Sequence, residues 1–238
     1  ALGEGAFSYV EEKINKIEMK KKSLIIAFLF SSLLGFGQHN ANHQNETSSP
    51  EKVIEFLKKY KVSEAHADNF GHMVIQDQGG RMKPINTFSS ELLRKVSKND
   101  SYEGMNADQV LLSMTQFGQY WYNLPIIYLK RGNDSIRKII GIDKNEKYAS
   151  LLNFFDEKGN YKLAPYLDEA YRTNVPNQFQ KDFKEADMRV NLMYSAISGE
   201  ILKVYPIPND KNNKWVSFLE ISEPTGTALD TIKNLMPI

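Results

Sequence analysis

A chain of 238 residues with a formal net charge of +1 and no cysteine has the length of one medium-sized domain with appendages. Its hydrophobic fraction of 41% supports a packed core, which excludes a wholly disordered chain. Residues 39–238 carry equal numbers of acidic and basic side chains, which argues against a nucleic-acid-binding protein because such proteins present a basic face to phosphates. Without cysteine, the chain holds no disulfide, thiolate metal site, cysteine nucleophile or covalent haem attachment of its own.

The first 48 residues are predicted to form a charged cytoplasmic segment (1–18), a membrane segment (19–38) and a flexible polar tether (39–48). Lysines 20–22 directly precede an apolar run from Leu24 to Phe36, a pattern found both in cleaved secretory signals and in signal anchors. Both interpretations leave the lysines in the cytoplasm. A buried helix of a soluble protein does not explain the lysine cluster. We therefore expect a chain in the inner (cytoplasmic) membrane, with the residues after 38 on the periplasmic side.

Residues 49–238 are expected to form one exported, mostly helical domain that is incomplete at its C-terminus. The predicted fold class is mainly α, an α+β arrangement with one small β-hairpin behind a single N-terminal membrane helix. The hairpin is placed at residues 72–86, where apolar and polar residues alternate around the turn Asp77–Gly80. Helical spacing of apolar residues predicts helices that open at residues 49, 63, 87 or 89, 106, 134 and 178.

Shorter features complete the predicted domain. Ser49, Ser63, either Thr87 or Ser89, and Asp134 are expected to cap their helices. The longest helix is expected over 178–205, ending before Pro206. A buried strand is expected over Ile126–Leu129, a turn around residues 158–160, and a polar loop over 209–215.

The histidines provide only weak candidates for a cofactor site. His39 and His43 have the i, i+4 spacing of a helical metal site, but they lie in the polar tether, where ordering costs backbone entropy. His66 and His72 flank a short predicted helix, and structural roles are favoured for both. They are retained as cofactor-binding candidates because a haem needs only one imidazole on each side. No metal site is predicted.

No catalytic centre is predicted either. The acidic pairs Asp156–Glu157 and Asp168–Glu169 lie among lysines and tyrosines at solvated positions, whereas acid–base catalysis needs one carboxyl group in a buried environment. Phosphate-binding loops, nucleophile elbows and zinc-protease signatures are absent from the sequence. The aromatic stretch 120–125 is interpreted as a core plug, with stacking on a flat ligand as the alternative.

Five segments together resemble the exported domain of Bacteroidetes-type fused ResB/CcsA proteins of system II cytochrome c biogenesis. They are Val74–Ser97, Asn106–Phe117, Asn123–Lys130, Lys147–Leu163 and Val204–Ser217. The resemblance implies an accessory exported domain of a protein that carries haem outward and attaches it to apocytochrome c. Its implied partners are apocytochrome c and the membrane haem-handling half of the same system.

The family's tryptophan-rich haem motif has no counterpart here, because Trp121 and Trp215 stand alone. No haem ligand is therefore assigned to this chain, and haem is implied only for the full-length protein. The resemblance is compatible with cytochrome c synthase activity of that protein, although this segment has no recognisable catalytic centre. The alternatives are a secreted or periplasmic binding protein with a signal peptide and no haem role, and a secreted hydrolase using the acidic pairs.

Three basic residues form a candidate docking patch. Arg81 and Lys83 are two apart on one predicted strand and so share a face, and Arg94 lies on the helix that follows. They are expected to lie near one another. One interpretation is three solvated charges. The other is a docking surface for an acidic partner loop or for haem propionates, where arginine binds a carboxylate with two hydrogen bonds.

Overall fold

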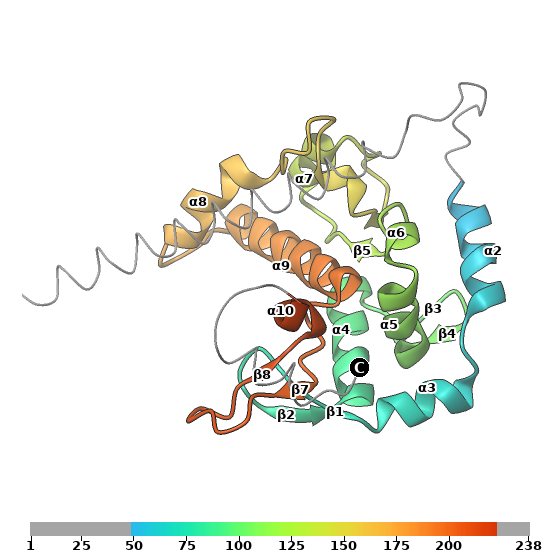
Figure 1. Cartoon of the computed structure of the whole chain (residues 1–238). Helices are drawn as coiled ribbons and strands as arrows, with labels where there is room; N and C mark the ends of the chain where they lie inside the picture. Colours follow the sequence, from blue (N-terminus) through green and yellow to red (C-terminus); the bar gives the residue numbers. More distant parts are fainter. Residues whose placement is uncertain (1–48, 223–238) are drawn as a thin grey trace, which may run out of the picture. The chain divides into compact units, whose positions relative to one another are not determined.

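The computed structural model describes residues 49–222 (Figure 1). The chain divides into two compact units: residues 155–162 belong to the smaller one, and the described residues 49–154 and 163–222 belong to the larger one. The predicted cytoplasmic segment, membrane segment and tether lie outside the described residues. Between residues 49 and 222, none of the helices is both long and apolar enough to cross a bilayer.

The larger unit is mainly helical with small antiparallel sheets, as the sequence predicts. Its longer helices are α2 (Pro50–Tyr60), α3 (Glu64–Gly71), α4 (Ile85–Ser97), α5 (Ala107–Gln116), α7 (Asp134–Ile140), α8 (Ala164–Arg172) and α9 (Gln178–Ser198). Short helices are α6 (Gly118–Trp121), η1 (Leu152–Phe154) and α10 (Phe218–Ser222). The strand pairs are β1–β2 (Val74–Gln76, Met82–Pro84), β3–β4 (Ser101–Tyr102, Met105–Asn106), β5–β6 (Ile127–Tyr128, Tyr148–Ala149) and β7–β8 (Tyr205–Pro206, Trp215–Val216).

The predicted hairpin is present as β1–β2. Gln76 pairs with Met82 next to the turn, and Gly80 takes a left-handed conformation with φ of 79° that glycine adopts without steric cost. The carboxylate of Asp77 closes the turn, because its Oδ1 accepts hydrogen bonds from the N–H groups of Gly79 (2.9 Å) and Arg81 (3.0 Å). The turn is therefore built by one aspartate and one glycine, as the sequence pattern suggests.

Helix α4 begins earlier than predicted. Its N-cap is Pro84, and neither Thr87 nor Ser89 caps it. The N–H of Ile85 donates to the carbonyl of Met73 across the hairpin (2.8 Å), so the strand pairing satisfies a donor that a cap would otherwise serve. Ser89 instead donates to the carboxylate of Asp108, which links α4 to α5. The strand thus continues into the helix without a loop.

Helix α9 packs against both α4 and α5, and Figure 1 shows it running across the larger unit. Phe183, Val190 and Met193 are buried along it, whereas Phe179, which was also expected in its apolar spine, is exposed. The predicted end at residue 205 is wrong. The helix stops at Ser198 because Gly199 takes a left-handed cap with φ of 76°. The chain then runs back to the hairpin, where the N–H of Gln76 donates to the carbonyl of Lys203 (3.0 Å).

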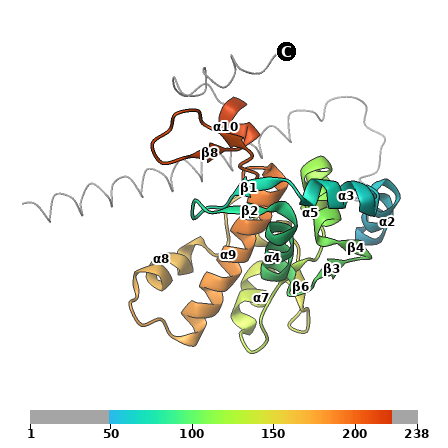
Figure 2. The same cartoon turned by 90° about the horizontal axis from the view of Figure 1, so that it is seen from below.

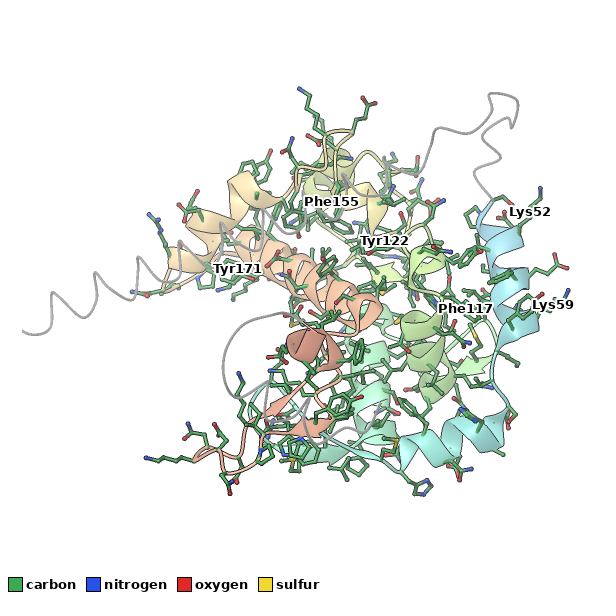
Figure 3. All side chains as sticks on the ribbon, in the orientation of Figure 1. Lys52, Lys59, Phe117, Tyr122, Phe155 and Tyr171 are labelled. Carbon is green, nitrogen blue, oxygen red and sulfur yellow. The ribbon has the colours of Figure 1, made fainter. Side chains whose placement is uncertain are left out.

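A cluster of aromatic rings fastens α2 to the α5–α6 region. Phe56 stacks on Tyr120 with ring centroids 4.5 Å apart and meets Phe117 edge-on at 5.4 Å. Phe117 lies between α2 and α5, while Lys59 projects outward from α2 (Figure 3). Trp121 is fully buried, and its Nε1 donates to the Ser113 hydroxyl (3.1 Å). The aromatic stretch 120–125 therefore serves packing, the use predicted for it.

Several smaller predictions can be compared directly with the structure. Ser63 caps α3 by accepting from the His66 N–H, as expected, but α7 is capped by Asn133 rather than Asp134. Ser49 stands at the N-cap position of α2, but its side chain makes no capping hydrogen bond. The buried strand appears as β5, and residues 207–214 connect β7 to β8, so the predicted polar loop 209–215 runs one residue into β8. The hairpins β3–β4 and β7–β8 and helix α8 were not predicted.

The smaller unit contributes one described turn. Phe155 and Tyr161 form an isolated antiparallel bridge, and their rings pack at 5.5 Å. Within the turn, Asp156 Oδ1 accepts from the N–H groups of Lys158 (2.9 Å) and Asn160 (2.8 Å). The side-chain amide of Asn160 also donates to Asp156 Oδ2 (2.9 Å), and this bond is the main cause that lowers the pKa of Asp156, followed by the backbone bonds. The predicted turn around residues 158–160 is confirmed.

Candidate functional site

A groove with a volume of about 200 Å³ lies where the β1–β2 turn, α4 and the C-terminal part of α9 meet. We call it the hairpin groove. Its floor is apolar and consists of Phe88, Leu92, Leu192 and Ile201. Its rim carries charged side chains: Asp77, Arg81, Lys83, Glu91 and Lys95. All of these residues belong to the larger unit.

Lys83 sits between two carboxylates on the rim. Its Nζ lies 2.9 Å from Glu91 Oε2 and 3.2 Å from Asp77 Oδ2. The hydrogen bonds to Glu91 and Asp77 raise the pKa of Lys83, while the backbone N–H of Arg81 is the main cause that lowers the pKa of Asp77. Lys83 therefore holds the hairpin onto α4, and its charge is neutralised within the domain.

Arg81 keeps most of its guanidinium free. Its Nε lies 3.4 Å from Asp77 Oδ2, yet the side chain is 81% exposed. Arg81 and Lys83 thus share one carboxylate, so the structure brings these two predicted docking residues together. Arg94 lies apart from the groove lining and pairs with Asp100 just beyond the end of α4. The hydrogen bond to Asp100 raises the pKa of Arg94.

Lys95 is a groove residue that sequence reasoning missed. It is exposed on the rim, and its ammonium has no acidic partner in the part of the chain that the structure describes. A sequence signal for it existed. Phe88, Leu92 and Lys95 follow one another at helical spacings of four and three, so they share a face of α4, whereas Arg94 is only two residues from Leu92 and falls outside this series. The spacing of the apolar residues Phe88 and Leu92 could therefore have indicated Lys95, and not Arg94, as the cation on this face of α4.

The histidine candidates lie at the two ends of α3. His66 is exposed, and its backbone N–H belongs to the Ser63 cap. His72 Nδ1 lies 2.7 Å from the carbonyl oxygen of Asp68, and the side chain is also exposed. Across residues 49–222, no three His, Asp or Glu side chains gather in a way that could hold a metal ion. His66 and His72 remain predicted cofactor ligands, and His39 and His43 lie outside the described residues.

The acidic pairs make structural contacts. Asp168 Oδ1 lies 3.1 Å from Arg172 Nε on the same helix, and Glu169 accepts a hydrogen bond from Gln180 (3.1 Å), which joins α8 to α9. Asp156 organises its own turn, as described above. These contacts stabilise turns and helix pairs.

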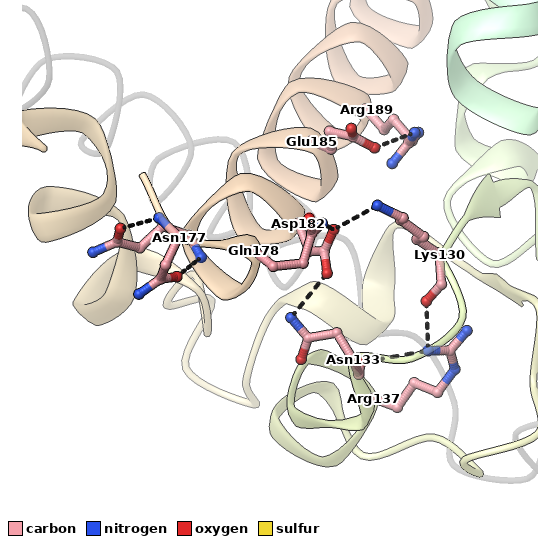
Figure 4. Close-up of polar contacts among 9 residues, drawn as sticks. Lys130, Asn133, Arg137, Asn177, Gln178, Asp182, Glu185 and Arg189 are labelled. Atoms are coloured by element: carbon pink, nitrogen blue, oxygen red, sulfur yellow. Dashed lines mark hydrogen bonds and ion pairs between the residues drawn. The ribbon is translucent and has the colours of Figure 1, made fainter. Parts of the chain in front are cut away.

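A second polar cluster surrounds Asp182 on α9 (Figure 4). The buried carboxylate accepts from Gln178 Nε2 (2.7 Å), Asn133 Nδ2 (3.4 Å) and Lys130 Nζ (3.3 Å). Four polar side chains thus join α9 to the segment between β5 and α7. Because its hydrogen bonds are made within the domain, this cluster is structural.

The buried Arg189 connects this region to the groove. Its Nε donates to the carbonyl of Lys95 (3.1 Å), its terminal nitrogen pairs with Glu185 (3.0 Å), and its guanidinium lies over the ring of Tyr128 at 5.4 Å. Helix α9 thereby holds the backbone of the last turn of α4 at Lys95. The α4 side of the hairpin groove is therefore fixed by a side-chain hydrogen bond from α9.

Comparison with known proteins gives one clear similarity. The chain is 32% identical to Protein NrfI of Wolinella succinogenes over 169 residues, which are 69% of this chain. The same stretch is 18% of NrfI, so the chain spans less than a fifth of the curated relative that it matches. No family model matches the chain.

Proposed function

We propose that this chain is the exported accessory domain of a membrane protein of cytochrome c maturation. The observation that carries the proposal is the 32% identity to Protein NrfI over 169 residues, which supports a role in cytochrome c maturation. The resemblance of five segments to fused ResB/CcsA proteins points in the same direction. The domain's task in this proposal is to present apocytochrome c to the haem-handling half of the full-length protein, whose haem chemistry takes place elsewhere.

The proposed location is the inner membrane, with the domain on the periplasmic side. The lysines at positions 20–22 followed by the apolar run Leu24–Phe36 support this orientation. Apocytochromes receive haem outside the cytoplasm in the family that the sequence resembles, so this location is also the one the function requires.

Within the domain, we assign partner docking to the hairpin–α4 surface, which includes Arg81, Lys83 and Arg94. Arg81 and Arg94 are largely exposed, and each retains guanidinium nitrogens for a carboxylate of a partner. The surface also contains the hairpin groove, a concave feature with buried apolar side chains at its base. A rigid hairpin joined to a helix without a loop is a suitable frame for such a surface.

The test is charge reversal at Arg81 and Arg94 together (R81E/R94E) in the full-length protein. We expect the yield of covalently attached c-type haem to fall about tenfold or more at unchanged protein level, because two attractive contacts become repulsive. The control K144E/K211E changes exposed lysines that do not line the groove and leaves the yield unchanged.

A topology control completes this experiment. A cysteine placed at Lys144 of the full-length protein adds labelling by a membrane-impermeant maleimide in intact cells, over the unsubstituted full-length protein as background, only if the domain is exported. Normal haem attachment in a correctly folded, labelled R81E/R94E protein would contradict docking at this surface and favour a secreted binding protein with no haem role. Failure of labelling would contradict the proposed location.

A further inference from the structure

We propose that the hairpin groove binds an acidic segment of a partner protein, with one large apolar side chain on the groove floor and flanking carboxylates on Arg81 and Lys95. The inference deepens the proposed function and rests on it for the partner's identity as apocytochrome c. The class of ligand itself follows from the groove alone.

The charge of the rim is the first argument. The rim carries three cations, Arg81, Lys83 and Lys95, and two carboxylates, those of Asp77 and Glu91, so its net charge is positive. Lys83 contacts both carboxylates and Arg81 contacts Asp77 while staying mostly exposed, whereas Lys95 has no acidic partner among the described residues. Arg81 projects from the hairpin and Lys95 from α4. A ligand with carboxylates on either side of an anchor complements this arrangement, and the planar guanidinium of Arg81 can hold one of them with two hydrogen bonds.

The size and lining of the groove give the second argument. Phe88, Leu92 and Ile201 form a floor of buried apolar side chains, and the volume of the groove is about 200 Å³. Pockets for drug-sized ligands hold roughly 300–1,000 Å³. The hairpin groove is therefore too small for a large flat cofactor and is suited to one leucine- or phenylalanine-sized side chain.

The third argument is that the groove is preformed. Asp77 accepts a hydrogen bond from the N–H of Arg81 and so fixes the turn that carries this residue. Arg189 donates a hydrogen bond to the carbonyl of Lys95 and so fixes the backbone there. A ligand therefore meets a surface whose backbone is already ordered, which reduces the entropic cost of binding.

Binding through side chains is also favoured over addition of a strand to the hairpin. The outward N–H of Gln76 on β1 already donates to Lys203, and Pro84 on β2 has no N–H. Strand addition needs a row of free backbone donors and acceptors, which this hairpin does not offer.

The test is fluorescence anisotropy with the whole 238-residue chain in nanodiscs. The probe is a labelled nine-residue peptide with a central leucine between two glutamates on each side. We expect saturable binding that weakens about fivefold in R81Q and in K95Q, about 20-fold or more in R81Q/K95Q, and less than twofold in K144Q, because Lys144 is exposed and lies outside the groove lining. Replacing the central leucine by alanine should weaken binding about tenfold.

Equal binding by the wild type and R81Q/K95Q, equal binding of the leucine and alanine peptides, or no binding of the leucine peptide overturns the inference. Thermal melts of each variant show that the fold is retained. Peptide binding lost in R81Q/K95Q, together with normal haem attachment by R81E/R94E, would uphold the groove and overturn its role in cytochrome maturation. The converse pair of results would uphold that role and overturn the assigned ligand class.

Discussion

Replacing Arg137 by methionine is expected to lower the free energy of unfolding by about 3 kcal/mol or more. Arg137 lies on α7 and is 2% exposed. Its guanidinium donates to the carbonyl oxygens of Glu146 (2.8 Å), Leu129 (3.0 Å) and Lys130 (3.0 Å), and these bonds hold α7 to the β5–β6 region. Methionine fills a similar volume but leaves these acceptors unpaired, and each buried unsatisfied group costs about 1–3 kcal/mol.

Chemical denaturation of the whole chain measures this effect. The matched control is Lys138→Met on the neighbouring, exposed position of the same helix, which should change the free energy of unfolding by less than about 0.5 kcal/mol. Lysine at position 137 keeps the charge but loses the fork that reaches several carbonyls, so R137K should recover only part of the loss. A loss below about 1 kcal/mol in R137M would show that the carbonyl network does not carry this part of the fold.

Replacing Gln76 by leucine is expected to release the β7–β8 hairpin from the rest of the larger unit. The buried amide of Gln76 joins two segments far apart in sequence: its Oε1 accepts from the Trp215 N–H (2.8 Å), and its Nε2 donates to the carbonyls of Asn213 (2.9 Å) and Gly80 (3.2 Å). Figure 2 shows β8 lying beside β1, the two strands that these hydrogen bonds connect. Leucine matches the size but satisfies none of these groups.

Hydrogen exchange is the appropriate measurement, because the expected change is local. Loss of these bonds at a buried site should lower the free energy of local opening by about 2 kcal/mol, so amide exchange over residues 205–216 becomes about 30-fold faster. Amides in α9 should keep their protection. The control Gln78→Leu changes an exposed side chain of the same turn and should leave exchange over 205–216 unaltered. Unchanged exchange in Q76L would contradict the assigned role of Gln76.

Local sequence signals predicted the helices that local residues determine. Asn106 forms a capping box with Gln109 at the start of α5, where the helix was predicted to begin. Gly199 is an equally local signal for the end of α9, but the prediction overlooked it. The apolar spacing continues past Gly199 to the buried Ile201, which is why the helix was extended to residue 205. The true path depends on the bond between Gln76 and Lys203, and no local pattern reveals that contact. The hairpin β3–β4 was missed because strands of two residues are too short for a periodic signal.

In the candidate site, too, contacts between residues far apart in sequence were not predictable. Arg81 and Lys83 lie together because both contact Asp77, although Arg81 belongs to the turn and not to β2, so the strand period predicted for them does not explain the contact. Neutralisation of Lys83 by Glu91 depends on how α4 folds back on the hairpin, so a sequence pattern could not distinguish a free lysine from a paired one. Lys95 lines the groove, whereas Arg94 was predicted to lie there. Neighbouring residues of a helix are rotated by about 100° about its axis, so the two side chains project in different directions.

In-cell photocrosslinking at Lys95 shows whether this domain contacts apocytochrome c. A photoreactive amino acid is placed at position 95 of the full-length protein, and at Lys144 as the control, in cells that express a tagged apocytochrome c. Because Lys95 lines the hairpin groove and Lys144 does not, the account predicts a covalent adduct with apocytochrome c from position 95 only. Absence of that adduct, or equal adducts from both positions, would contradict presentation of apocytochrome c by this domain.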